Sequence, residues 1–334
     1  MKPAEPRISV VIPTFNRLER LRLVLDAFAR QTVSRETFEL IVVSDGSTDG
    51  THAFLESSPP LPLRWAQQAN SGPAVARNHG VSLARGTYVL FVDDDVVAAP
   101  NLIERHLLGH GDSLSTIVIG PMLNADGFHY SPWVAWEQAM LYKQYEALRT
   151  GRFEANARQF YTGNASMARC LFDEVGGFDE TYRRAEDIEM AYRLNQHDVT
   201  FVFDEQAAAY HHASRSFESW MAAAYAYGHN DVRFSRTHEQ PWMLDALCHD
   251  YCSRNVLLRG IARLSLSVPP TTKVLSAGLR IAAMTLARLK LQRTARYALS
   301  GLYGLGYYNG AAAELGGPRA LLDMIAAHRR PVPA

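Results

Sequence analysis

Residues 88–100 read YVLFVDDDVVAAP, and this stretch decides how the first half of the chain is interpreted. The segment at 87–92, TYVLFV, is typical of a strand that is buried on both faces. Asp93, Asp94 and Asp95 follow it directly. Carboxylates this close repel one another and raise each other's pKa, a cost that a bound divalent cation removes. The run therefore predicts either a polar turn or a cation site at the end of a buried strand.

The chain around this stretch alternates between strand and helix signals. Strands are predicted at 7–13 (RISVVIP), 38–44 (FELIVVS), 61–67 (LPLRWAQ, weaker), 87–92 and 115–120 (STIVIG). Helices are predicted at 16–31, from Thr48 or Asp49 to Glu56, and at 73–84, where a proline occupies the first turn. Short alternating units of this kind indicate an α/β fold with a mostly parallel, doubly wound sheet and helices on both faces.

Two acidic groups follow strands of this predicted sheet. Asp45 comes directly after 38–44, and residues 93–95 come after 87–92. Ligands of open α/β sheets bind beyond the carboxyl ends of the strands, so both groups are predicted on one rim. Carboxylate oxygens suit Mg²⁺ or Mn²⁺, which complete their shells with water and substrate phosphates. The residues thus favour a metal-and-phosphate site over a solvated turn.

Six segments resemble, in order and spacing, the inverting glycosyltransferases of family 2, which have the GT-A fold. They are VVIPTFNR (10–17), VVSDGSTDGT (42–51), ARNHG (76–80), FVDDDV (91–96), TGNASMARCLFDEVGGFDE (162–180) and AEDIEMAYRL (185–194). The resemblance covers about residues 7–235. It implies a GT-A catalytic domain at 1–235, with a nucleotide-binding half to about 122 and an acceptor-side half at about 123–235. A basic helical region would follow at 236–334.

The resemblance also implies a site for a nucleoside diphosphate sugar, with UDP as the expected nucleotide. Pro13 and Phe15 would open the nucleotide pocket, and Asp45 would accept a hydrogen bond from the base. Arg77 would meet the base or the diphosphate, and Asp93 would contact the ribose or the metal. The full donor-binding set is Pro13, Phe15, Asp45, Arg77, Asp93 and Asp94.

The metal and the reacting groups are implied in the same way. Asp95 would ligate Mn²⁺ or Mg²⁺ together with Asp93 and one histidine of the pair at 211–212. Adjacent strand residues face opposite ways, so at most one of the two can reach the metal, and His211 is preferred over His212. Without the resemblance, these two histidines would read as a surface pair.

Asp187 is the expected general base, because the family places that role on the aspartate of its Glu-Asp pair. Gly163, Asn164 and Glu186 are expected to shape the donor-sugar and acceptor site. From the residues alone, the acids at 186, 187 and 189 would read as a negative first turn that complements a helix dipole.

Charge divides the chain. The total is 34 Lys/Arg and 34 Asp/Glu, but residues 251–334 hold 12 Lys/Arg and only 2 Asp/Glu. Basic amphipathic helices can lie on an anionic bilayer, which predicts peripheral contact with a membrane surface. The alternatives are a helical subdomain packed on the core and a dimer interface, which would make a homo-oligomer.

The predicted function is metal-dependent, inverting transfer of a hexose from a nucleotide sugar to a hydroxyl of a glycan or lipid-linked acceptor. Cell-surface polysaccharide or glycoconjugate synthesis is the expected setting. An inactive nucleotide-sugar-binding scaffold is the main alternative. A sugar-phosphate nucleotidyltransferase is disfavoured because PTFNRLER lacks the glycines of a phosphate loop. No nucleic-acid motif appears, so no nucleic-acid partner is expected.

Localisation is predicted from what the chain lacks. It has no apolar stretch of membrane-spanning length, no signal-peptide pattern and only 3 cysteines. We expect a cytoplasmic protein that is peripheral at the inner face of the cell membrane if the basic region binds lipid.

Overall fold

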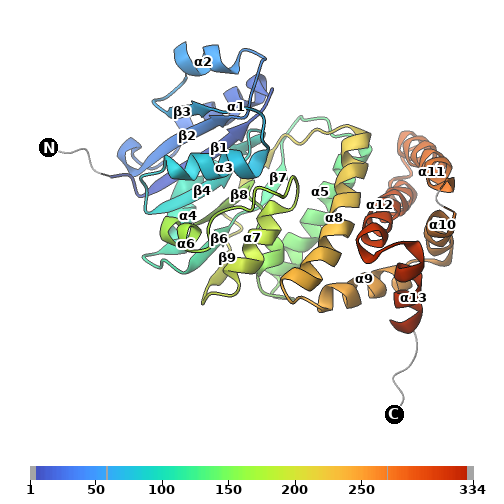
Figure 1. Ribbon diagram of the computed structural model, residues 1–334. Coiled ribbons are helices and arrows are strands. Elements are labelled where there is room, and N and C mark those ends of the chain that lie inside the picture. Colours follow the sequence, from blue (N-terminus) through green and yellow to red (C-terminus); the bar gives the residue numbers. More distant parts are fainter. Residues whose placement is uncertain (1–4, 58, 269, 329–334) are drawn as a thin grey trace. The chain divides into compact units, whose positions relative to one another are not determined.

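The structure is a computed structural model that describes residues 5–57, 59–268 and 270–328 (Figure 1). It divides into two compact units. Met1–His129 and Gln138–Ala213 form an α/β unit, and Tyr130–Glu137 and Ser214–Ala334 form a helical unit. The long helix α5 (Pro132–Arg149) begins in the second unit and continues in the first.

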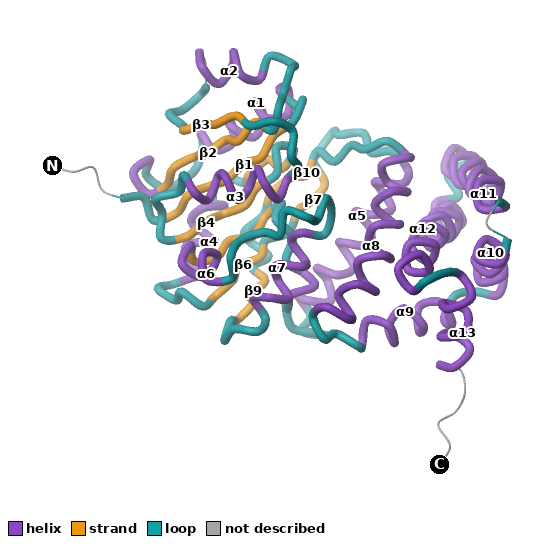
Figure 2. Tube along the Cα trace, in the orientation of Figure 1, coloured by secondary structure: helices purple, strands orange, loops and turns teal. Residues whose placement is uncertain are grey.

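A seven-stranded sheet is the centre of the α/β unit, and its strands are orange in Figure 2. The strands, in spatial order, are β3 (Arg64–Gln67), β2 (Phe38–Ser44), β1 (Ile8–Thr14), β4 (Tyr88–Val92), β8 (Asn164–Ala168), β6 (Thr116–Ile119) and β9 (Thr200–Phe203). All neighbouring pairs are parallel except those of β8, which is antiparallel to both β4 and β6. The prediction of a mostly parallel α/β sheet is confirmed, including the weaker strand β3.

A small three-stranded sheet lies beyond the end of β4. It consists of β5 (Val96–Ala98), β10 (Ala209–His211) and β7 (Met122–Asn124), with β10 in the middle. β10 runs antiparallel to β5, and His211 is paired with Val96. The backbone N–H of His212 also donates to the carbonyl of Asp95 at 2.8 Å. This pairing brings the histidine segment to the three aspartates, although more than a hundred residues separate them in sequence.

Helices cover the large sheet. They are α1 (Leu18–Ala29), α2 (Thr51–Ser57), α3 (Pro73–Ser82), α4 (Leu102–His110), α6 (Arg169–Glu174) and α7 (Glu186–Leu194), with short 3-10 turns at Arg35–Thr37 and Ala157–Gln159. The first three match the predicted helices. α3 packs directly on β1. The two are so close that a Cβ at Gly80 would collide with the side chain of Val11. Tight packing here explains the glycine in ARNHG.

Four strands were not predicted, namely β5, β7, β8 and β9. β8 reads NASMA, which has small residues and no β-branched run, yet all five positions are buried. Its strand conformation comes from pairing with β4 and β6 on both sides and not from local propensity. β5 and β7 have three residues each, too few to show a period of two.

The helical unit contains α8 (Phe217–Thr237), α9 (Trp242–Ser253), α10 (Val256–Ser267), α11 (Thr271–Arg288), α12 (Gln292–Leu315) and α13 (Pro318–His328). α8 and α12 form its core, where Trp220 packs with Leu302 and Val232 packs with Tyr308. Among the described residues, no helix is both long and apolar enough to cross a membrane.

Candidate active site

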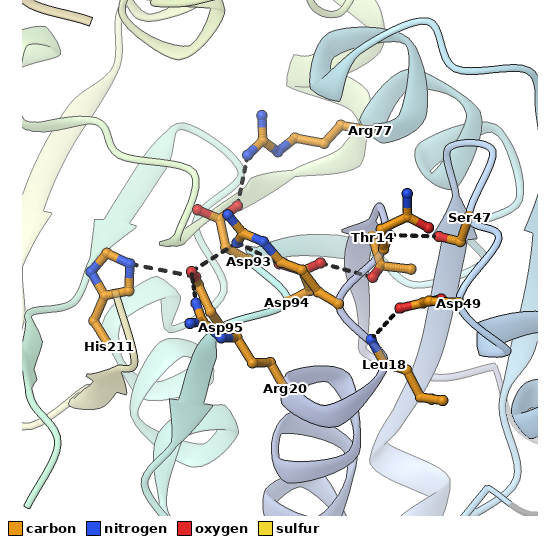
Figure 3. A network of polar contacts seen from close by, with 12 residues as sticks. Thr14, Leu18, Arg20, Ser47, Asp49, Arg77, Asp93, Asp94, Asp95 and His211 are labelled. Atoms are coloured by element: carbon orange, nitrogen blue, oxygen red, sulfur yellow. Dashed lines mark hydrogen bonds and ion pairs between the residues drawn. The ribbon is translucent and has the colours of Figure 1, made fainter. Parts of the chain in front are cut away.

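Asp93 is the outermost of the three aspartates and is part of a chain of charges. Its side chain is 35% exposed, and its Oδ1 accepts a hydrogen bond of 2.7 Å from Nη2 of Arg77 (Figure 3). The Nη1 of Arg77 donates to Oε1 of Glu186, also at 2.7 Å. Arg77 itself is buried, so its charge depends on both carboxylates. The arginine therefore connects the aspartate run with the Glu-Asp pair of α7.

Asp94 turns toward β1. Its Oδ2 accepts a hydrogen bond of 2.7 Å from Thr14 Oγ1, and its Oδ1 accepts one of 3.0 Å from Arg17. Burial raises the pKa of Asp94 to about 6, although Arg17 and the bond from Thr14 oppose this rise. Asp94 thus fixes the end of β4 against β1, and its predicted contact with the donor stays a prediction.

Asp95 is the most charge-compensated of the three. Its Oδ2 accepts from Arg17 at 2.8 Å and from Arg20 at 3.3 Å, and His211 Nε2 lies 3.4 Å from its Oδ1 (Figure 3). Burial raises the pKa of Asp95, but the hydrogen bond and charge of His211 and the two arginines outweigh it and lower the pKa to about 2. The carboxylate is therefore ionised in a buried position, as a cation ligand must be.

The structure distinguishes the two adjacent histidines. The ring of His212 packs against Phe128 at a centroid distance of 5.1 Å. The ring of His211 faces Asp95 with Nε2, while its Nδ1 lies 3.1 Å from the amide of Gln138. His211 is therefore the histidine of the pair that faces Asp95, and its role as a metal ligand stays a prediction.

The hydrogen bonds of Gln138 show whether His211, which faces Asp95, is oriented to bind a metal. As placed, its Nε2 faces Nδ1 of His211, and its Oε1 is buried without a hydrogen-bond partner. Amide oxygen and nitrogen are assigned from such networks. With the amide turned over, Oε1 accepts from Nδ1–H of His211, and the amide nitrogen takes the buried position that has no hydrogen-bond partner. In that tautomer His211 Nε2 carries a lone pair and no longer donates a hydrogen bond to Asp95, which is the form that second-shell partners give to metal-binding histidines.

The donor set fits Mn²⁺ or Mg²⁺ held by few protein groups. In the described part of the chain, no three His, Cys, Asp or Glu side chains come together closely enough to hold a metal. The predicted set of Asp93, Asp95 and His211 is therefore not assembled, because Asp93 faces Arg77. Asp95 and His211 still offer an oxygen and an imidazole nitrogen, and these ions commonly take their other ligands from water and phosphates.

The Glu-Asp pair lies on the first turn of α7. Ala185, the N-cap, has φ +62°, a left-handed conformation that costs an alanine on the order of 1–3 kcal/mol. It turns Glu186 inward to Arg77. Asp187 is partly exposed. Its Oδ1 accepts from the N–H of Ile188 at 2.9 Å, and its Oδ2 has no hydrogen-bond partner among the described residues.

The surroundings of Asp187 make it more basic. Burial, and then the charge of Glu186, raise the pKa of Asp187 well above its ordinary value, although Arg77 opposes the rise. A carboxylate with a raised pKa and a free oxygen is suited to take a proton from a hydroxyl near neutral pH.

Gly163 and Asn164 have different roles. A Cβ at Gly163 would collide with Met122 and lie 3.2 Å from Oδ2 of Asp93, so the glycine leaves space beside that carboxylate. The Asn164 side chain is buried and fully used: it donates to the carbonyls of Pro121 and Ala207, and its Oδ1 lies 2.9 Å from His106. The expectation that Asn164 contacts the donor sugar is therefore corrected, since its side chain belongs to the scaffold.

Asp45 orders the loop on the other side of the rim. Its Oδ1 accepts from Gln68 and from the N–H of Ser71, both at 2.8 Å, and its Oδ2 accepts from the N–H of Gly72 at 2.9 Å. Pro13 is partly buried at the end of β1, and the ring of Phe15 is 46% exposed. An exposed aromatic ring beside this loop is suited to stack on a nucleotide base.

Sequence reasoning missed four residues of this network. Arg17 and Arg20 neutralise the aspartates, Thr14 anchors Asp94, and Gln138 contacts His211. Arg17 stands inside VVIPTFNR, one residue after Asn16, which has φ +52°. A positive charge so close to a predicted metal site was a usable signal. No sequence signal joined Gln138 to a histidine 73 residues away.

A separate cleft of about 840 Å³ runs along β9, between residues 148–156 and 195–206. It contains none of the carboxylates described above. Because the ionised and pKa-shifted groups converge elsewhere, at the ends of β4 and β10, the site is placed there.

Comparison with known proteins identifies the family. The family model described as Glycosyl transferase family 2 matches residues 9–176, which is half of the chain. Validoxylamine A glucosyltransferase of Streptomyces hygroscopicus subsp. jinggangensis is 32% identical over 229 residues, covering 60% of this chain and 54% of that protein. The chain thus spans about half the length of the first curated relatives it matches.

Solved structures show the same fold at lower identity. The mannosyltransferase PcManGT from Pyrobaculum calidifontis, in complex with GDP-Man and Mn²⁺, is 20% identical with a TM-score of 0.60, covering 93% of this chain and 87% of that one. S. aureus TarS 1-349 in complex with UDP-GlcNAc is 20% identical with a TM-score of 0.50, covering 88% and 90%. These matches confirm the predicted GT-A-type fold. The match to the family model shows that the chain belongs to glycosyl transferase family 2.

Proposed function

We propose that this chain is a metal-dependent, inverting glycosyltransferase that uses a nucleoside diphosphate sugar, with UDP as the nucleotide. The observation that carries the proposal is the charge chain from Asp93 through Arg77 to Glu186, beside Asp187. It supports Asp187 as a basic carboxylate close to the aspartates that follow β4. Family membership supports the same reaction class.

The reaction needs one displacement. The acceptor oxygen attacks the anomeric carbon of the donor, a new C–O bond forms, and the bond from that carbon to the diphosphate breaks with both electrons leaving on the phosphate. The acceptor proton goes to Oδ2 of Asp187. Attack from the face opposite the leaving group inverts the anomeric centre, so no nucleophile from the protein is required.

The aspartate rim prepares the leaving-group side. Asp95 and His211 would hold Mn²⁺ or Mg²⁺, which stabilises negative charge on the diphosphate as it leaves. Arg17 and Arg20 already face Asp95, and their guanidinium groups can also bind phosphate oxygens. Phe15 and the loop that Asp45 orders would receive the base.

The donor and acceptor are proposed from chemistry and from relatives. The solved neighbours bind GDP-Man and UDP-GlcNAc, and a curated relative is a glucosyltransferase, which supports a hexose as the transferred sugar. We propose a hydroxyl of a glycan or lipid-linked molecule as the acceptor, in cell-surface polysaccharide or glycoconjugate synthesis. The catalytic domain is proposed to extend over residues 1–235, which includes most of α8 from the helical unit, with 236–334 as a further helical region.

Slow hydrolysis of the donor, with water as the acceptor, tests this function without knowledge of the acceptor. Purified protein is incubated with UDP-glucose, UDP-GlcNAc or GDP-mannose and Mn²⁺, and proton NMR follows the released sugar. We expect one donor to release its sugar, and only when metal is present. The sugar should first appear with the anomeric configuration opposite to that in the donor. A retained anomer would contradict single displacement, and no release from any of these or further nucleotide sugars would favour an inactive scaffold.

A further inference from the structure

One side of α10 carries apolar side chains in solvent. Val256 and Leu257 are 76% and 72% exposed, and Leu264 and Val268 are also exposed. Positions 257, 264 and 268 recur at helical spacing, so they share a side. The other side of α10 is buried and includes Leu258, Ala262 and Leu266. The helix therefore already has a core-facing side, and the exposed residues form a second apolar side.

α11 repeats this pattern in a more pronounced form. Ala283 is its one fully buried residue among eighteen. Val274 and Ile281 are 72% and 66% exposed, and Leu289 and Leu291, which follow on toward α12, are exposed as well. The spacing of seven between 274 and 281 keeps both on one side of the helix. Scattered exposed apolar residues are normal, but a group of them along two adjacent helices marks a contact surface.

α10 and α11 are neighbours, and the exposed surface of this helix pair carries both stripes. The helices contact each other and α12 (Figure 1), and Ser265 of α10 hydrogen-bonds Thr272 of α11 at 2.7 Å. We call this surface the α10–α11 face. Its apolar members are Val256, Leu257, Leu264, Val268, Val274, Ile281, Leu289 and Leu291.

The charge around the α10–α11 face has one sign. No Asp or Glu occurs between residues 251 and 313. Exposed basic residues on or beside these helices, with no carboxylate partner among the described residues, are Arg263, Lys273, Arg288, Lys290 and Arg293. By contrast, Arg254 is paired with Asp250 and Arg280 with Glu218. The unpaired cations flank the apolar stripes and are not part of the packing.

We propose that the α10–α11 face binds the surface of an anionic lipid bilayer. Apolar side chains would enter the boundary between headgroups and acyl chains, and the flanking cations would contact lipid phosphates. A second copy of the same face would bring like charges together, with no acidic residue in 251–313 to compensate them. Nucleic acid would use the cations but leave the apolar stripes in water. This binding does not depend on the proposed transfer reaction, and it would place that reaction beside a lipid-linked acceptor.

The test is flotation of the full chain with vesicles, without donor or metal. We expect binding to phosphatidylcholine vesicles that contain phosphatidylglycerol, weaker binding at high salt, and little binding to phosphatidylcholine alone. The pair Arg263→Gln with Lys273→Gln should reduce partition roughly 25-fold, since each cation near an anionic surface contributes about fivefold. The pair Val274→Ser with Ile281→Ser should reduce it by about tenfold for each residue.

Matched controls change the same residue types on the α/β unit. They are Arg30→Gln with Arg85→Gln, and Leu108→Ser with Leu114→Ser; all four residues are exposed. These variants should float like the wild type, and unchanged melting temperatures would show that all variants fold. Equal binding by the test and control variants, or no binding to anionic vesicles, would overturn the proposal. Self-association that is lost in the apolar pair, without vesicle binding, would overturn it in favour of a second copy. Donor hydrolysis, measured separately, would be unaffected in either case.

Discussion

Asp187→Asn is expected to lower the rate of sugar transfer by about 10²-fold or more, the range of general-base catalysis, while nucleotide binding stays intact. The substitution keeps the shape of the side chain and the hydrogen bond from the N–H of Ile188. It removes the free carboxylate oxygen that would accept the acceptor proton. Donor hydrolysis or transfer measures the rate, and titration with UDP and Mn²⁺ measures binding.

The pH profile gives this prediction a second readout. Only the ionised form of Asp187 can accept a proton, and burial and Glu186 raise its pKa above the ordinary value of 3.8. Transfer by the wild type should therefore fall as pH decreases through this raised pKa, at higher pH than for an ordinary aspartate. Asp173→Asn, a change at an exposed carboxylate on α6, is the control and should change neither rate nor profile. Near-normal turnover of Asp187→Asn would place the base elsewhere.

Asp95→Ala is expected to abolish the metal dependence of donor binding. Asp95 is the buried, ionised carboxylate beside His211. Because Mn²⁺ or Mg²⁺ would be held by few protein groups, it would not stay bound without this carboxylate. Arg17 and Arg20 would remain and leave the rim positively charged. We therefore expect UDP to bind the variant with the same affinity in Mn²⁺ and in EDTA, as measured by calorimetry.

The substitution Gln138→Leu tests the orientation of the proposed metal ligand His211 separately from the loss of a ligand. It keeps Asp95 and His211 but removes the amide next to Nδ1 of His211. Loss of a second-shell partner typically costs 10- to 100-fold in metal affinity, so Mn²⁺ binding followed by paramagnetic resonance should weaken by that factor. Asp126→Ala removes an exposed carboxylate of the same unit and should leave Mn²⁺ affinity unchanged. If Asp95→Ala kept a metal-dependent donor affinity, the cation assignment would be wrong.

The fold was largely predictable because most of its strands and helices show their characteristic hydrophobic pattern in the sequence. β1, β2 and β4 are continuous apolar runs, and α3 begins at its proline as expected. β8 was missed because its conformation depends on the strands beside it, a tertiary effect that NASMA does not show locally.

The sequence singled out residues that lie near one another, but it did not show which side chains they contact. Asp93, Asp95, Glu186, Asp187 and His211 all lie in one network or next to it. Which side chain faces which could not be read from the sequence. Arg77 connects two carboxylates, and Asn164 is held by the carbonyls of Pro121 and Ala207. Such pairings depend on side-chain directions that are set by packing between distant segments.

The most direct test of the central claim is thermal stabilisation of the purified chain by UDP, GDP, dTDP and CDP, each with Mn²⁺ and with EDTA. A ligand present at 100 times its dissociation constant stabilises the folded state by about 2.7 kcal/mol, which is readily seen as a higher melting temperature. We predict a rise with UDP that requires Mn²⁺. No rise with any of the four nucleotides, or an equal rise in EDTA, would contradict a metal-dependent nucleotide-sugar site on the rim at Asp95 and His211.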